Sequence, residues 1–386
     1  MDVILTQQIA MYEWRRMRCG EPIRLEPTAL TEVPRICDHA GCERWLSSPE
    51  VKVLIGVDVK GVLPIREDAA CHRGHSAATR GHVSSYALPA FAFWELRTAA
   101  QFNEDSMRDS ETPWRLLVDG PELCVLSAAN ALLELVREGA FPRWVAELKL
   151  SEYMMELCGT YSRDPKHPQT GTCTFDIHPV TSVENIEKCF GEGHERQPGV
   201  RLIRDALRWA RDNSRSPMES VAYLAWRCPP RYGCISAGQP KLNESLKLSK
   251  RQLSLIKHRT ITPDIQLDFF DALVEYLGDE SHRSRAAHDE DRRRWQDYTT
   301  LGLRSYPMTF DDIKSPGAFM AFCRRLAEGM NGPQRRARMQ HLNRLCRNDR
   351  FVERQAQFLK WMLPPVTRYD DYLGGAKAGM DALWGF

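Results

Sequence analysis

The most constraining feature of this chain is the order in which two hydrophobic periodicities alternate between residues 200 and 308. Some segments there have the 3.6-residue spacing of helices, and others are short apolar runs typical of strands. The helical segments are residues 200–212, 217–226 and 285–301, and the strand-like segments are 265–269, 272–276 and 303–308. This order predicts a mixed sheet flanked by helices, with strands 265–269 and 272–276 paired as an antiparallel hairpin.

Composition excludes several other classes of protein. Hydrophobic residues make up 42% of the chain and charged residues 27%, which is typical of a folded globular protein. The net charge of +2 argues against a globally basic nucleic-acid coat. No apolar run reaches the roughly 18–20 residues that span a bilayer, and the first residues lack the basic region of a secretory signal. We therefore expect no membrane partner.

The length of 386 residues allows two or three domains at about 150 residues each. A loop rich in proline and glycine over residues 160–173 points to a boundary before Gly199. We expect a mixed α+β domain over 1–195, an α/β domain over 196–325 and a basic helical extension over 326–386. Within the first domain, the pattern predicts helix over 1–20, strands over 51–65 and a helix over about 123–138.

The cysteines indicate a compartment. The chain has 12 of them, scattered and without a CxxC pair. In an oxidising compartment such a set would risk scrambled disulfides. We expect free thiols and a cytoplasmic location.

Three acidic residues stand at positions that suit a divalent cation. Glu219 lies near the start of a predicted helix, Asp264 at the start of one predicted strand, and Glu275 near the end of the next. Mg²⁺ takes oxygen ligands and is usually held by one or two carboxylates together with waters and substrate phosphate. Such an ion would polarise a phosphodiester and activate a water. The residues therefore predict an Mg²⁺ or Mn²⁺ site formed by Glu219, Asp264 and Glu275.

Each of these residues also has a purely structural interpretation. Ser216 and Glu219 fit a capping box, in which serine caps the helix and glutamate reaches back to a backbone N–H. Asp264 fits a turn. Glu275 is harder to explain structurally, because an unpaired carboxylate buried at the end of an apolar strand is costly.

The same residues carry a resemblance to the PD-(D/E)xK nuclease superfamily, and more narrowly to its very-short-patch-repair-like endonuclease branch. The matching positions are Ser216-Pro217-Met218-Glu219, Pro263-Asp264, Val274-Glu275-Tyr276, His282, Asp291, Arg294 and Gly302. The module is also similar to the C-terminal region of abortive-infection antitoxin proteins. The resemblance implies a restriction-endonuclease-like fold, a metal-dependent endonuclease, and a role for His282 at the scissile phosphate or in orienting water.

One position departs from the family pattern. Leu277 stands where the family has an acidic residue, or lysine in the wider superfamily, and leucine neither binds metal nor positions water. Two hypotheses follow. The first is a DNA-acting endonuclease of a defence or mobile-element system. The second is a DNA-binding or antitoxin-like regulator that keeps the fold and has lost catalysis.

Basic residues suggest where DNA would lie. Arg294 belongs to the predicted helix 285–301, which is rich in charged residues. Arg335 and Arg338 belong to an arginine-rich run over residues 335–350, in which Asp349 is the only acidic residue. Arginine binds phosphate bidentately, so we expect these three to contact nucleic acid. A solvated helix face is the alternative. Residues 1–195 carry no motif with a recognisable chemistry, and we expect them to recognise DNA or a protein partner.

Overall fold

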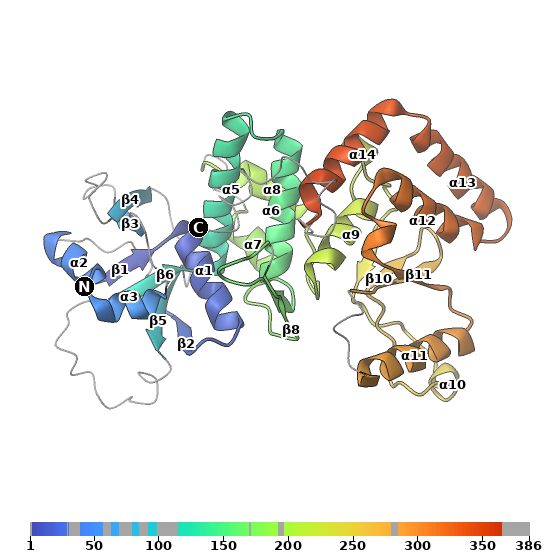
Figure 1. Ribbon diagram of the computed structural model, residues 1–386, viewed down its shortest axis with the longest axis horizontal. Helices are drawn as coiled ribbons and strands as arrows, with labels where there is room; N and C mark the ends of the chain where they lie inside the picture. Colours follow the sequence, from blue (N-terminus) through green and yellow to red (C-terminus); the bar gives the residue numbers. More distant parts are fainter. Residues whose placement is uncertain are drawn as a thin grey trace. The chain divides into compact units, whose positions relative to one another are not determined.

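The computed structural model describes residues 2–28, 30, 39–56, 63–68, 79–84, 92–98, 115–169, 171–191, 197–278 and 285–364. These residues belong to two compact units (Figure 1). The first extends to Leu157 and includes Tyr161–Arg208. Of the described residues, the second contains Cys158–Thr160 and those of 209–364. Both units combine helices with a sheet that has parallel and antiparallel neighbours, so the chain is a mixed α/β protein.

The first unit contains a six-stranded sheet in the order β2-β5-β6-β1-β3-β4. The pairs β1–β6 and β3–β4 are parallel, and the other neighbours are antiparallel. The strands are β1 (Asp2–Leu5), β2 (Ile23–Pro27), β3 (Leu63–Asp68), β4 (Thr79–Ser84), β5 (Phe93–Thr98) and β6 (Arg115–Asp119). Two-residue strands β7 (Tyr161–Ser162) and β8 (Thr174–Phe175) pair separately.

Two predictions for this unit were right only in part: α1 (Gln7–Arg18) fills most of the helix predicted over 1–20, and β3 begins within the strands predicted over 51–65. The chain opens on strand β1 and only then forms helix α1, because the run Val3–Leu5 is buried inside the sheet. The β-branched run after Ser48 begins as helix α3 (Pro49–Ile55). Its end signals outweigh β propensity: Ser48 caps the first turn, and Gly56 closes the helix with φ 68°.

A layer of helices completes the first unit. The apolar run predicted as a helix near 123–138 is α5 (Pro121–Arg137), which packs on α1 and on α6. The remaining helices are α2 (His39–Leu46), α6 (Arg143–Leu157), α7 (Val183–Cys189) and α8 (Val200–Leu207). From Leu148 to Leu157 every residue of α6 is buried, including Lys149, Glu152 and Glu156.

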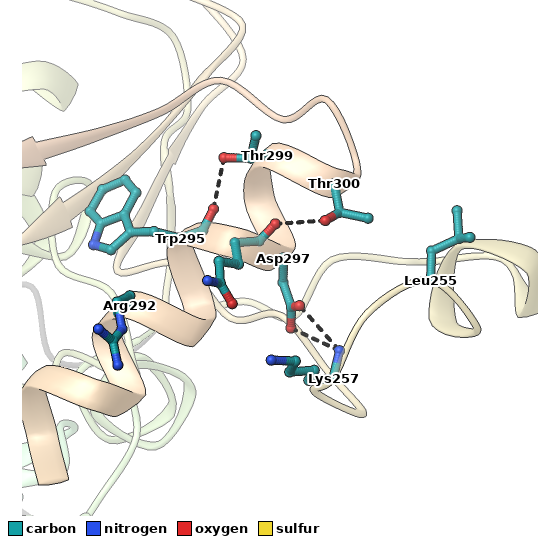
Figure 2. A pocket seen from close by; sticks show the side chains of 8 residues that line it. Leu255, Lys257, Arg292, Trp295, Asp297, Thr299 and Thr300 are labelled. Carbon is teal, nitrogen blue, oxygen red and sulfur yellow. Dashed lines mark hydrogen bonds between the residues drawn. The ribbon is translucent and has the colours of Figure 1, made fainter.

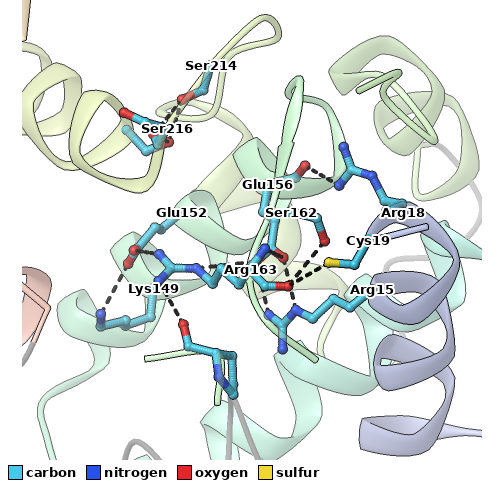
Figure 3. A network of polar contacts seen from close by, with 12 residues as sticks. Arg15, Arg18, Cys19, Lys149, Glu152, Glu156, Ser162, Arg163, Ser214 and Ser216 are labelled. Atoms are coloured by element: carbon cyan, nitrogen blue, oxygen red, sulfur yellow. Dashed lines mark hydrogen bonds and ion pairs between the residues drawn. The ribbon is translucent and has the colours of Figure 1, made fainter. Parts of the chain in front are cut away.

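These buried charges are paired with one another (Figure 3). Arg15 donates two hydrogen bonds of 2.9 Å to the carboxylate of Glu156. Arg163 donates to Glu152, which also accepts from Lys149 at 3.1 Å. Burial alone would raise the pKa of Glu156, but Arg15 and Arg163 outweigh it and hold that pKa below its usual value. Arg15, Arg163, Lys149, Glu152 and Glu156 therefore neutralise one another.

The second unit is built on a four-stranded sheet in the order β12-β11-β10-β9. The strands are β9 (Lys241–Leu242), β10 (Ile265–Leu267), β11 (Ala272–Tyr276) and β12 (Ser305–Met308). β10 is antiparallel to both β9 and β11, and β11 is parallel to β12. The predicted hairpin is confirmed, with Ile265 opposite Val274, and Asp271 takes φ 48° in its turn. β9 was missed because two residues show no period.

Helices surround this sheet. Two of the three predicted flanking helices are here, α9 (Pro217–Arg227) and α11 (Arg285–Thr300). The third, predicted over 200–212, is α8 and belongs to the first unit, because it packs on α5 and α6. Trp226 of α9 is fully buried against Phe319 and Phe322 of α12. The others in the described ranges are α10 (Lys250–Leu253), α12 (Pro316–Glu328), α13 (Gly332–Cys346), α14 (Asp349–Met362) and the single 3₁₀ turns η1 (Pro230–Tyr232) and η3 (Phe310–Asp312). The basic helices α13 and α14 thus belong to the same compact unit as the sheet.

A pair of glycines provides a test of this packing. Gly233, after η1, has φ 82°, and a Cβ there would lie 2.4 Å from the backbone of Gln355 in α14. Gly238 has φ 78°, but a Cβ there would meet nothing within 4 Å. Gly238→Ala should therefore cost only the left-handed strain of about 1–2 kcal/mol. Gly233→Ala should cost about 1–3 kcal/mol more, because α14 must move. Urea unfolding of the two variants measures the difference, and equal losses would contradict close packing of η1 on α14.

Candidate functional site

Glu219 lies in the first turn of α9. The Ser216 Oγ accepts a hydrogen bond from the Glu219 N–H at 3.1 Å, so the predicted serine cap is confirmed. The Glu219 carboxylate reaches past the cap residue and accepts from the N–H of Arg215 at 3.1 Å. It also accepts from the Asn243 Nδ2 at 2.6 Å. Glu219 is only 6% exposed, and therefore caps its helix from inside the protein.

Asp264 stands directly before β10 and joins two neighbouring strands. Its Oδ2 accepts from the N–H of Tyr276, at the end of β11, at 2.8 Å. Its carbonyl oxygen accepts from the N–H of Asn243, which follows β9, at 2.9 Å. The carboxyl group of Asp264 is thereby placed at the edge of the sheet where β9 and β11 end and β10 begins.

Glu275 lies on β11, in register with Pro307 of β12, and is 4% exposed. Both of its oxygens have partners on α11: Oε1 accepts from the Tyr298 hydroxyl, and Oε2 lies 3.4 Å from Arg294 Nη1. Arg294 and Tyr298 are four residues apart and so share one face of α11. This face connects the central strand to the helix that packs over it.

The three acidic residues act on one another electrostatically. Burial raises the pKa of Glu219 to about 7, and the negative charge of Asp264 adds to this. Burial also raises the pKa of Glu275 to about 8, again with a contribution from Asp264 that Tyr298 and Arg294 only partly offset. The structure thus brings the predicted trio within electrostatic reach, with Asp264 acting on both glutamates. Perturbed carboxyl groups of this kind are typical of functional sites.

Asn243 is a site residue that the sequence did not reveal. It has φ 51°, and its Nδ2 donates to Glu219 and to the carbonyl oxygen of Asn213. Its Oδ1 is buried and has no hydrogen-bond partner among the described residues. An amide flip would turn this oxygen toward the Glu219 carboxylate, so the two donor bonds fix its orientation. The available signal was an asparagine directly after an apolar residue, since asparagine tolerates a left-handed turn.

The donor set fits Mg²⁺ in its chemistry. It offers carboxylate oxygens and one unsatisfied amide oxygen, which are the hard ligands that Mg²⁺ prefers. In the described ranges no three His, Cys, Asp or Glu side chains are gathered into a ready metal-binding group. The fit is therefore to an ion held by one or two carboxylates and completed by water and substrate.

The other predicted site residues are distributed differently. His282 lies outside the described residues. Leu277 is half-buried, and its N–H donates to the carbonyl oxygen of Met308. Arg335 is exposed on α13. Arg338 instead packs over the ring of Phe269 at 3.8 Å, and its Nε donates to the Phe269 carbonyl oxygen at 2.8 Å.

No protein family, curated protein or solved structure matches this chain. None of the helices in the described ranges is both long enough and apolar enough to cross a bilayer. Every cysteine in those ranges is a free thiol.

The raised pKa values give a stability prediction with a definite sign. Glu275 has an ordinary pKa of 4.5, and the folded metal-free protein raises it to about 8. The folded state therefore binds more protons than the unfolded state between these pH values, and the free energy of unfolding falls as pH rises through them. Glu275→Gln removes one such group, so it should flatten this loss and stabilise the protein at pH 8 by about 1–3 kcal/mol.

Urea unfolding in EDTA at pH 5 and pH 8 measures this effect. Glu328→Gln, an exposed carboxylate of the same unit, is the matched control and should leave the pH dependence unchanged. An identical pH dependence in wild type and Glu275→Gln would contradict the buried, uncompensated state of Glu275.

Proposed function

We propose that this chain is a DNA-acting protein whose second unit is a restriction-endonuclease-like domain for metal-dependent phosphodiester hydrolysis. The observation that carries the proposal is the placement of three acidic residues on a helix and two paired strands of one mixed α/β unit. Glu219 lies on α9, Asp264 before β10 and Glu275 on β11, and the charge of Asp264 acts on both glutamates.

The order of elements supports the proposed fold. The unit runs α9, β9, β10, β11, α11, β12, and its sheet has two antiparallel pairs followed by one parallel pair. The parallel pair β11–β12 is joined through α11, as a parallel connection requires. The PD-(D/E)xK resemblance places its first acidic residue on the leading helix and the others on consecutive strands. Glu219, Asp264 and Glu275 have this arrangement.

Asp264 with Glu219 or Glu275 would hold Mg²⁺, and water and substrate would complete its ligands. Bound there, the ion supplies charge neutralisation at the phosphate and activates water. The protein's own residues prepare the site. Asn243 orients the Glu219 carboxylate, and Tyr298 orients that of Glu275. Arg294 supplies a cation beside Glu275 that Leu277 does not.

A catalytically decayed, DNA-binding or antitoxin-like regulator is the second candidate function. The observation that favours it is that both oxygens of Glu275 are occupied by groups of α11, while Leu277 offers no polar group at all. In either function we place the protein in the cytoplasm, in a defence or mobile-element system. The first unit would then recognise DNA or a protein partner.

A nicking assay separates the two functions. Purified protein should nick plasmid DNA with Mg²⁺ or Mn²⁺, slowly because of Leu277. Glu275→Ala should abolish nicking, because it removes the buried carboxylate, while Glu328→Ala should not. Leu277→Asp should raise the rate if the site is only weakened, because it adds an oxygen ligand beside Glu275.

The regulator is favoured by a different set of results. Wild type and Leu277→Asp would both be inert on single-stranded, duplex and mismatched DNA, yet bind DNA with an affinity that falls with salt. A protein that neither cleaves nor binds DNA at low salt would exclude both functions.

The arginines of α13 provide a further test of DNA contact. Arg335, Arg336 and Arg344 are exposed and have no carboxylate partner within the described ranges. Neutralising all three to glutamine should weaken DNA binding and leave the free energy of unfolding nearly unchanged. Arg338→Gln should leave DNA binding nearly unchanged and lower the free energy of unfolding by about 1–2 kcal/mol. The reason is that the Arg338 side chain stacks on Phe269 and donates to its carbonyl oxygen. Fluorescence anisotropy and urea unfolding measure the two effects, and equal behaviour of the two variants would contradict this division.

A further inference from the structure

The connection between β9 and β10 has an unusual charge pattern. Residues 245–260 contain five lysines and arginines and no acidic residue. All five of these cationic side chains are exposed, and none has a carboxylate partner in the part of the chain that the structure describes. They are Lys247, Lys250, Arg251, Lys257 and Arg259. We call residues 245–260 the basic loop.

The basic loop is held in a defined conformation. Ser249 and Gln252 form a reciprocal capping box that starts the single turn of α10. Leu246, Leu248 and Ile256 pack against the buried cluster of Ile261, Leu273 and Tyr298. These three apolar side chains therefore anchor the loop on the core, while its cations, together with Leu253 and Leu255, are exposed. The cationic surface is preformed and does not have to order itself on binding.

A single carboxylate attaches the loop to α11. Asp297, whose side chain is 4% exposed, accepts from the N–H of Lys257 at 3.1 Å, from the N–H of His258 at 3.1 Å and from the His258 Nδ1 at 2.6 Å. Figure 2 shows Asp297 reaching from the helix to the backbone of Lys257. Burial would raise the pKa of Asp297, but these hydrogen bonds outweigh it and hold the pKa below its usual value. Asp297 thus acts as an ionised attachment point under the loop.

Beside this attachment lies a hollow of about 480 Å³ between the loop and α11. Lys257 and Arg292 contribute cations to its lining, and Trp295 contributes an aromatic face (Figure 2). Cations around an aromatic ring suit a phosphate chain with its attached bases. The lining thus adds an independent indication to the charge of the loop.

We infer that the basic loop and the adjoining face of α11 form a surface that binds the phosphate backbone of DNA and guides it toward Glu275. The inference rests on the proposed function, because the DNA follows from it. The link to the acidic site is α11 itself. Arg294 and Tyr298 of this helix contact Glu275, while Asp297, between them in sequence, holds the loop. The five exposed cations of residues 245–260, a stretch with no acidic residue of its own, match a continuous polyanion.

The test is DNA binding without catalysis. Fluorescence anisotropy with a labelled duplex of about 30 base pairs, in EDTA and over a KCl series, gives the affinity and its salt slope. The triple variant Lys250→Gln, Arg251→Gln, Lys257→Gln should bind about tenfold more weakly, and its slope should fall by about 2–3, close to 0.9 for each lost phosphate contact. The matched control removes three exposed cations of the second unit that lie outside the loop and α13: Arg231→Gln, Arg350→Gln, Lys360→Gln.

The outcomes separate the inference from the proposed function. A loss confined to the loop variant supports the inference. If the wild type binds DNA and the loop variant binds it equally well, the inference is overturned and the proposed function still stands. A wild type that fails to bind DNA even at low salt overturns both. Acetylation of exposed lysines gives a readout without substitutions: DNA should protect Lys247, Lys250 and Lys257 but not Lys166, and equal labelling would count against the surface.

Substitution of Asp297 gives a second test. The expected change in DNA affinity is opposite to the change that charge repulsion alone would cause. Removing a negative charge next to bound DNA should strengthen binding if only long-range electrostatics mattered. If Asp297 positions the loop, Asp297→Ala should weaken binding several-fold and speed amide hydrogen exchange at Lys257 and His258. Asp297→Asn keeps an acceptor oxygen and should restore much of the affinity. Tighter binding by Asp297→Ala would overturn the positioning role.

Discussion

The second unit depends on the burial of Glu275 in the middle of its sheet. Burying a carboxylate on a strand whose other side chains are apolar costs free energy. Two hydrogen-bond donors on one face of α11 offset part of this cost. Tyr298 and Arg294 bond Glu275, and Tyr298 also belongs to the apolar cluster that supports the basic loop. The position of α11 over β11 is therefore tied to Glu275, and so is everything that α11 carries. A change at this one carboxylate would be felt both at the acidic site and at the loop.

The buried carboxyl groups are of two kinds: some are matched by cations, and others, including Glu13 of the first unit, have a raised pKa. In the first unit, Glu156 is matched by two arginines, and its pKa is lowered. In the second unit, Glu219 and Glu275 have raised pKa values because burial and Asp264 outweigh their donors. A fold under selection for stability alone would gain by neutralising or replacing these groups. Under the proposed function, a cation or substrate would complete the charge balance of Glu219 and Glu275 when it binds.

Much of the second unit could be predicted from its sequence, because its signals are local. The hairpin of β10 and β11 follows from two apolar runs around a tight turn, and α9 from a serine–proline start. What failed depended on tertiary context. β9 is two residues long and exists only because β10 lies beside it. The β-branched run after Ser48 becomes helical through its caps, and the opening residues become a strand because Leu5 fits between neighbouring strands.

The candidate acidic site also contains residues that could be predicted from the sequence and residues that could not. Glu219, Asp264 and Glu275 could be chosen by residue type and spacing, because carboxylates near the ends of predicted elements are visible in a sequence. Their partners could not. Asn243 and Tyr298 are 24 and 23 residues from the glutamates that they orient, and neither has a spacing that predicts the contact. Arg338, chosen for its charge, is instead committed to Phe269, a contact across 69 residues.

The position of Arg294 bears on how a site with Leu277 could still work. A lysine at 277 would share β11 with Glu275, whereas Arg294 reaches Glu275 from α11. A guanidinium keeps its charge at any physiological pH and presents several donors, so it can bind a carboxylate and a phosphate together. Its 36% exposed side chain leaves room for such a second contact. Arg294 on the helix would supply the positive charge that a lysine at position 277 would otherwise supply from the strand. It would not supply the proton transfer that a lysine allows. Under the proposed function, Leu277 would therefore affect the rate of hydrolysis more than the binding of DNA.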